Sequence, residues 1–161
     1  MIMAVKVGKA SVTELAVVDA TQRNPLGTIV QGANGEEFIY MVGVASNAIG
    51  KAVTYDEAGV TTLLVTNAVG PVAISMSAAV AAEWGWFCIL APQGVDALVA
   101  ANTAVDTLVG FETTSGNIGD GRAAGDQIYG IICRVANATA AAALREVQIW
   151  MHPFVDDIYG S

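Results

Sequence analysis

The sequence holds one histidine, so any catalytic mechanism that needs an imidazole must use it. His152 lies between Met151 and Pro153 near the C-terminus. A Ser-His-Asp or Cys-His mechanism needs a nucleophile beside this ring, and the sequence has no Gly-x-Ser-x-Gly motif to present a catalytic serine. We therefore interpret His152 as a structural or surface histidine.

Adjacent acidic residues are the next candidates, because two carboxyl groups supply the acid and the base of glycoside hydrolysis. Neighbours in an extended chain point to opposite faces, so no adjacent pair forms a dyad. A pair assembled from distant loops, such as Asp120 and Asp156, has no support in the sequence. The adjacent pairs are Glu36-Glu37, Asp56-Glu57 and Asp156-Asp157. Solvated turns explain them better, and we predict that the chain is not an enzyme.

The sequence also lacks the spacings that bind metals or phosphates. Cys88 and Cys133 each lie in an apolar, strand-like run without metal-ligand spacing, which is typical of buried thiols acting as small hydrophobes. The glycine-rich stretch 116–121 has neither a Gly-Lys-Ser/Thr sequence nor an alternating series of aspartates. We expect no metal and no cofactor.

The composition indicates a protein that covers part of its surface with partners. Hydrophobic residues make up 54% of the 161 residues, charged residues only 14%, and the mean hydropathy is +0.54. No window of about 18 residues is apolar throughout, so we expect no membrane span. Lys6 and Lys9 are followed closely by Ser, Thr and Glu, which does not fit a secretory signal. We expect synthesis in the cytoplasm, without translocation.

The charge argues against nucleic acid as a direct partner. Seven basic residues stand against fifteen acidic ones, which gives a formal net charge of −8. An acidic protein repels the phosphate backbone, so we predict no direct contact with nucleic acid.

From residue 26 onward, short runs of β-forming residues alternate with glycine, asparagine and aspartate, a pattern typical of an antiparallel β-sandwich or barrel. Asn34-Gly35 predicts a hairpin with a type I′ turn, and the segment 56–59 predicts a second hairpin. We expect separate strands over 84–90 and 96–100, with Trp84 and Trp86 in the core. Segments 115–122 and 137–145 are expected to be loops, the first of them exposed.

The chain thus divides into two parts. Residues 1–25 predict an N-terminal arm or an edge strand, and residues 26–161 predict one β-rich domain with an apolar C-terminal tail. Apolar residues in the arm and the tail are the candidates for contact with partners, since aromatic side chains often anchor interfaces. The candidate interface residues are Val5, Val7, Val12, Leu15, Phe154 and Tyr159.

Three stretches resemble the decoration, or cement, proteins of tailed-bacteriophage heads. The first runs from Leu26 to Ser46 and has the form Leu-Gly-Thr … Gly-Ala-Asn-Gly-Glu-Glu-Phe-Ile-Tyr. The second is Gly85-Trp86-Phe87-Cys88-Ile89, and the third is Pro153-Phe154-Val155. The likeness covers most of the chain from Asn24 onward, and its motifs are those of turns and strands.

The resemblance implies a virion protein on the outer capsid surface, where it stabilises the head by binding across neighbouring major capsid subunits. It also implies a homo-oligomer, with a trimer as the favoured order, and it offers no catalytic residues. A large apolar contact area suits such a clamp. Two alternatives remain at this point: a small-molecule-binding β-barrel, whose apolar residues would line a cavity, and another virion component such as a head fibre base or a tail-tube subunit.

Overall fold

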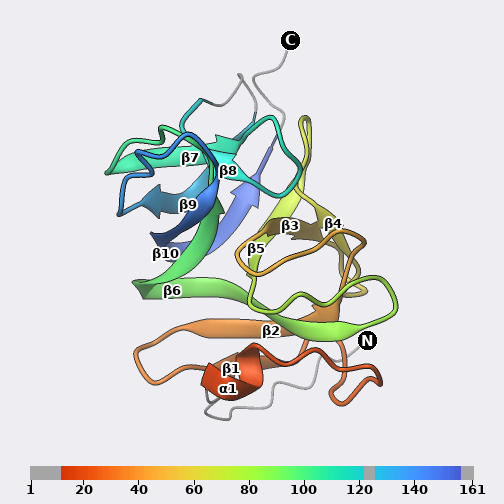
Figure 1. Ribbon diagram of the computed structural model, residues 1–161. Helices are drawn as coiled ribbons and strands as arrows, with labels where there is room; N and C mark the ends of the chain where they lie inside the picture. The colour runs from red at the N-terminus through yellow and green to blue at the C-terminus, as the bar shows by residue number, and fades with distance from the viewer. Residues whose placement is uncertain (1–11, 122–125, 157–161) are drawn as a thin grey trace.

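The computed structural model describes residues 12–121 and 126–156, which form a mainly β body (Figure 1). Ten strands make one sheet in the order β1-β2-β6-β8-β7-β9-β10-β5-β3-β4, and further pairings of β6 with β10 and β5 close it into a barrel-like ring. The strands are β1 (Ile29–Gln31), β2 (Glu37–Val42), β3 (Ala52–Tyr55), β4 (Thr61–Leu63), β5 (Gly70–Ser75), β6 (Trp84–Val99), β7 (Thr107–Phe111), β8 (Ile118–Gly119), β9 (Gln127–Cys133) and β10 (Ala143–Val155). The predicted fold class is confirmed, and the ring decides for a barrel-like body.

Both predicted hairpins are present, but the first has a different turn. Gln31 pairs with Glu37, and the N–H of Gly32 donates to the carbonyl of Glu36 at 2.8 Å. Only Gly35 of the loop has a positive φ, at 89°, whereas a type I′ turn needs positive φ at Asn34 as well. The prediction of a type I′ turn is therefore wrong. A three-residue loop with glycine in the left-handed position connects the strands instead.

The second hairpin joins β3 to β4 and is organised by one carboxylate. Asp56 Oδ1 accepts hydrogen bonds from the backbone N–H groups of Ala58 at 3.0 Å and Val60 at 2.9 Å. Gly59 takes a φ of 76°, which glycine adopts without steric cost. The turn chemistry recognised in the sequence thus acts as expected.

β6 is one strand of sixteen residues, so the prediction of separate strands over 84–90 and 96–100 is wrong. Its first half pairs with β2, from Trp84 opposite Val42 to Leu90 opposite Glu37. Its second half pairs with β10, from Ala91 opposite Ile149 to Val99 opposite Ala143. Each half has its own partner, so the polar residues between the two apolar runs do not end the strand.

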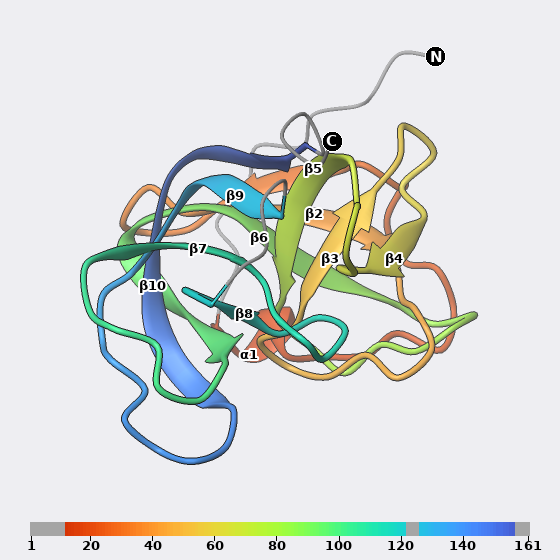
Figure 2. The ribbon, with the colours of Figure 1, turned by 90° about the horizontal axis from the view of Figure 1, so that it is seen from above.

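Short strands complete the ring between β6 and β10. β8 pairs in parallel with the end of β6, through Ile118 beside Val99, and β7, β9 and β10 follow with antiparallel pairing. Seen from above, β7, β8 and β10 lie to one side of the body and β3 and β4 to the other, with β5 between them (Figure 2). The closed order leaves β1 and β4 as the two edge strands.

The predicted exposed loop at 115–122 is largely buried, which corrects that expectation. Gly116, Asn117, Ile118 and Gly119 are all buried. The N–H of Gly116 donates to Leu64 O and the N–H of Ala52 donates to Gly116 O, both at 2.8 Å. Glycine allows this approach, because a Cβ at position 116 would lie 2.9 Å from Lys51 Cδ and its φ is 81°.

The core contains the apolar residues that the strands direct inward. Ile118, Ile131 and Ile149 are fully buried in one large cluster that also holds both free cysteines. Trp86 is 9% exposed and meets Tyr40 edge to face, with 5.1 Å between the ring centroids. The core assignment of Trp86 is confirmed, and Trp84 is partly buried against the same cluster.

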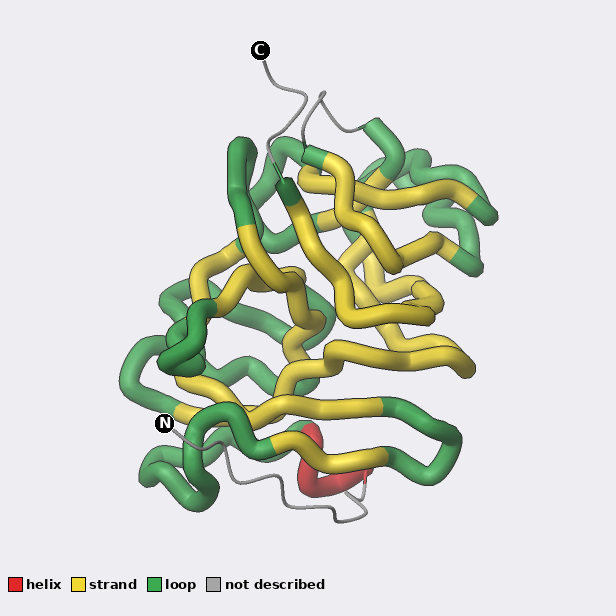
Figure 3. Tube along the Cα trace, turned by 180° about the vertical axis from the view of Figure 1, so that it is seen from behind, coloured by secondary structure: helices red, strands yellow, loops and turns green. Residues whose placement is uncertain are grey.

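The described part of the predicted arm packs on the body. It contains α1 (Val12–Leu15), at the base of the molecule in Figure 3. The backbone groups of Asp19 and Trp84 exchange two hydrogen bonds, of 2.9 and 3.0 Å. Residues 12–15 are helical, and the residues that follow them are attached to the start of β6. Residues 1–11 lie outside the described residues, so the extended arm stays a prediction for them. Within 12–121 and 126–156, no helix has the length and apolar character to span a bilayer.

The segment 137–145 is a loop over most of its length, as predicted, and becomes β10 at Ala143. Asn137 is fully buried and holds it in place. Its Nδ2 lies 2.9 Å from each of three carbonyl oxygens, those of Val99, Ala100 and Ala141, while its Oδ1 accepts from Thr139. One side chain thus satisfies the carbonyls where β6 ends.

We predict that Asn137→Ala destabilises the protein by about 3 kcal/mol, because it removes a fully buried side chain together with the hydrogen bonds of its amide to Val99 O, Ala100 O and Thr139. Urea unfolding followed by tryptophan fluorescence measures the change. Gln22→Ala is the matched control, since Gln22 makes a single exposed hydrogen bond to Asn24 O. A loss in Asn137→Ala no larger than in this control would contradict the assigned role.

Alkaline pH is expected to weaken the fold. Burial, followed by the hydrogen bond to Asp19, raises the pKa of Tyr40 from 10.0 to about 12, and burial raises the pKa of Cys88 from 9.0 to about 12. The folded state holds both protons more tightly than the unfolded chain, so this stability is complete below pH 9 and is lost as the pH rises toward 12. The urea concentration at the midpoint of unfolding should fall as the pH rises from 9 to 12, and it should fall less steeply in Tyr40→Phe and in Cys88→Ala than in the unmodified protein. Parallel slopes in all three proteins would refute the assignment.

Candidate interface surface

The residues that could do chemistry are dispersed in the structure. His152 Nε2 lies 2.8 Å from Glu37 Oε2, and the histidine side chain is 57% exposed. Both thiols are buried, and burial raises their pKa values, which keeps them protonated and unreactive. No group of three or more His, Cys, Asp or Glu residues suited to a metal ion occurs within the described residues.

The most distinctive surface feature is an irregularity in β10. Ile149 pairs with Ile131 of β9, and the next paired residue of β10, Phe154, stands opposite Tyr129. Four residues of β10, Trp150 to Pro153, therefore face the single residue Gly130 of β9. A bulge of this kind bends its strand and changes the direction of its side chains.

Gly130 makes the bulge possible. Its φ is 91°, and a Cβ there would lie only 2.6 Å from Met151 Cγ. Any other residue would be strained by this backbone conformation and would displace Met151. The shape of the bulge is thus determined by one glycine on the neighbouring strand.

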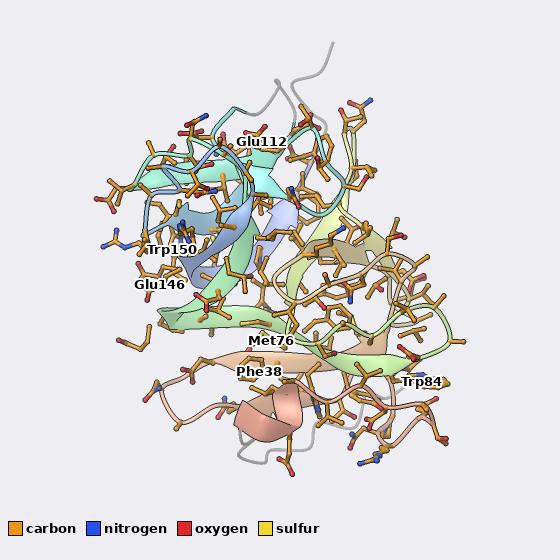
Figure 4. All side chains as sticks on the ribbon, viewed as in Figure 1. Phe38, Met76, Trp84, Glu112, Glu146 and Trp150 are labelled. Carbon is orange, nitrogen blue, oxygen red and sulfur yellow. The ribbon has the colours of Figure 1, made fainter. Side chains whose placement is uncertain are left out.

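Four large apolar side chains of β9 and β10, in and beside the bulge, are exposed. Tyr129 is 37% exposed, Trp150 47%, Met151 54% and Phe154 42%. We call them the β9–β10 strip. Figure 4 shows Trp150 beside β9 and β10, on the side of the molecule opposite Trp84. Exposed aromatic and methionine side chains gathered in one place are typical of a protein-binding surface.

Polar contacts on both sides hold the bulge in place. Gln148 Nε2 donates to Pro92 O at 2.6 Å, and the contact of His152 with Glu37 ties the bulge to β2. Along the same stretch of β10, the inward residues Ile149, Pro153 and Val155 are buried. The backbone that carries the strip is therefore supported by contacts with β6 and β2.

The candidate interface residues have different positions. Phe154 is exposed and belongs to the β9–β10 strip. Leu15 is 5% exposed inside the core of its own chain, so its assignment to an interface is corrected. Val12 begins α1, and nothing is described of its side chain. Val5, Val7 and Tyr159 lie outside the described residues.

Tyr129, Trp150 and Met151 were not among the candidates. The alternation of side chains along β9 could have indicated that Tyr129 is exposed, because the preceding residue, Ile128, points into the core. Trp150 follows the buried Ile149 in the same way. Met151 carries no such signal, since the bulge that exposes it interrupts the alternation.

Comparisons with known protein families, curated proteins and solved structures find no match to this chain. The case for its function thus rests on its residues and on the surface they form.

Proposed function

We propose that this chain is a structural virion protein that decorates and stabilises the outer surface of a phage capsid by binding across neighbouring major capsid subunits. The observation that carries the proposal is the β9–β10 strip, a set of exposed apolar side chains on a backbone that is tied to β6 and β2. Aromatic side chains near the centre of an interface supply most of its binding energy. A clamp needs such a surface and no reactive groups.

The composition and the sequence resemblance support the same proposal. The segments that resemble decoration proteins correspond to the β1–β2 hairpin, the first half of β6 and the end of β10. They build the sheet that carries the strip. In addition, buried side chains such as Ile118, Ile131 and Ile149 occupy the inside of the ring, which favours a packed clamp over a ligand-binding barrel. As a homo-oligomer on a repetitive shell, the protein would multiply weak contacts into tight binding.

Mass spectrometry of purified particles of the encoding phage tests the proposed place in the virion. A decoration protein is expected in hundreds of copies, in a fixed ratio to the major capsid protein. A copy number matching a single vertex or the tail would point to another virion component, and absence from the particles would overturn the proposal.

The strip itself is tested by Trp150→Ser with Phe154→Ser. Both side chains are about half exposed, so we expect a folded protein whose affinity for assembled capsids falls at least about tenfold, since such anchors contribute more than about 1.4 kcal/mol. Cosedimentation with capsids lacking the protein measures this. Val80→Ser is the matched control. Val80 is 39% exposed, and it lies outside the strip, in the loop that precedes the start of β6 at Trp84. Equal binding by the double variant and the control would exclude the strip as the contact surface.

A further inference from the structure

The tip of the β1–β2 hairpin combines an exposed amide with an unhindered backbone nitrogen. Asn34 is exposed, and Gly35 follows it with a φ of 89°. Apart from Gly35 itself and its two chain neighbours, no heavy atom of the described residues lies within 4 Å of the place where a Cβ of Gly35 would stand. Among the described residues, the N–H of Gly35 has no hydrogen-bond partner. This nitrogen is therefore free to react.

We propose that Asn34 is a site of spontaneous deamidation, which makes this hairpin the place where the protein acquires a negative charge with age. The backbone nitrogen of Gly35 gives its proton to solvent and forms a bond to Cγ of Asn34. The bond from Cγ to Nδ2 breaks, and Nδ2 leaves as ammonia. One water molecule then opens the cyclic imide at either carbonyl, which yields aspartate or isoaspartate. The step needs no oxidant, reductant or enzyme.

The sequence offers this chemistry at one position only. Asn34-Gly35 is the single Asn-Gly pair in the chain. Asn67 and Asn102 are also exposed, but Ala68 and Thr103 follow them, and a side chain on the following residue hinders attack by its nitrogen. These two asparagines are therefore controls within the same molecule.

The product would disturb the contacts that form the turn. The backbone N–H of Asn34 donates to Glu36 Oε2 at 2.9 Å, and Asn34 Nδ2 donates to Glu36 Oε1 at 3.1 Å. Deamidation replaces Nδ2 by a carboxylate oxygen that faces the carboxylate of Glu36, so an attraction becomes a repulsion. Isoaspartate also adds a methylene group to the backbone of a three-residue loop. Both products loosen the pairing of the edge strand β1.

Peptide mapping by mass spectrometry tests the proposal on the purified full chain, incubated at mildly alkaline pH. We expect a gain of about one dalton that accumulates in the peptide containing Asn34, with both aspartate and isoaspartate forms, while Asn67 and Asn102 stay unchanged. Asn34→Gln should show no gain in this peptide. An unmodified Asn34, or faster modification at Asn67 or Asn102, would overturn the proposal.

A second measurement tests the consequence for the turn. Asn34→Asp should unfold at a lower urea concentration than the unmodified protein. Adding Glu36→Gln to this variant should recover part of the loss, because it removes the facing charge. No loss in Asn34→Asp, or no recovery in the double variant, would contradict the assigned role of Glu36. Neither experiment depends on a capsid, so the result is independent of the proposed function.

Discussion

The antiparallel pairing of β6 with β10 holds the sheet together, because these two strands connect parts of the sequence that lie far apart. Val99 stands opposite Ala143 and Ala91 opposite Ile149, while the first half of β6 pairs with β2. A sheet closed in this way satisfies the backbone groups of its central strands and removes most of its edges. The apolar residues that alternate along both strands then meet inside the ring, where hydrophobic burial supplies the driving force for folding.

Closure has a cost, since backbone groups at the ends of the strands become buried away from water. Asn137 offsets part of this cost, and two further buried side chains, those of Asp126 and Asp19, hold neighbouring connections in place. Asn137 bonds to the carbonyls at the end of β6, Asp126 accepts from Thr66 and the N–H of Asn67 at the start of β9, and Asp19 accepts from the hydroxyl of Tyr40 where residues 12–25 pack on the body. Each is buried, and each lies in a connection outside the strands. Buried polar residues of this kind determine which loops belong to which strand ends.

The outer surface follows from the same pairing. β10 must continue alongside β9 after its bulge, and the bulge turns Trp150 and Met151 outward beside Phe154. The chain thereby exposes three large apolar side chains on a supported part of the sheet, where an ordinary monomer would place polar residues. The proposed role in a capsid shell gives this arrangement a physical reason, because contacts that must withstand pressure gain from rigid, preorganised anchors.

Local signals in the sequence were enough to predict the β class, both hairpins and most of the loop at 137–145, whose last three residues belong to β10. These signals suffice because alternation, Asp56 and Gly35 act on their immediate neighbours. They also predicted the core position of Trp86. The continuity of β6, the burial of Ile118 in a glycine-rich stretch and the core position of Leu15 depended on partners distant in sequence. The same is true of the candidate surface: Phe154 was recognised from its type, whereas the exposure of Met151 required the register between β9 and β10. Side-chain periodicity is a property of one strand, but register, bulges and burial are properties of pairs, and only the tertiary structure determines which pairs form.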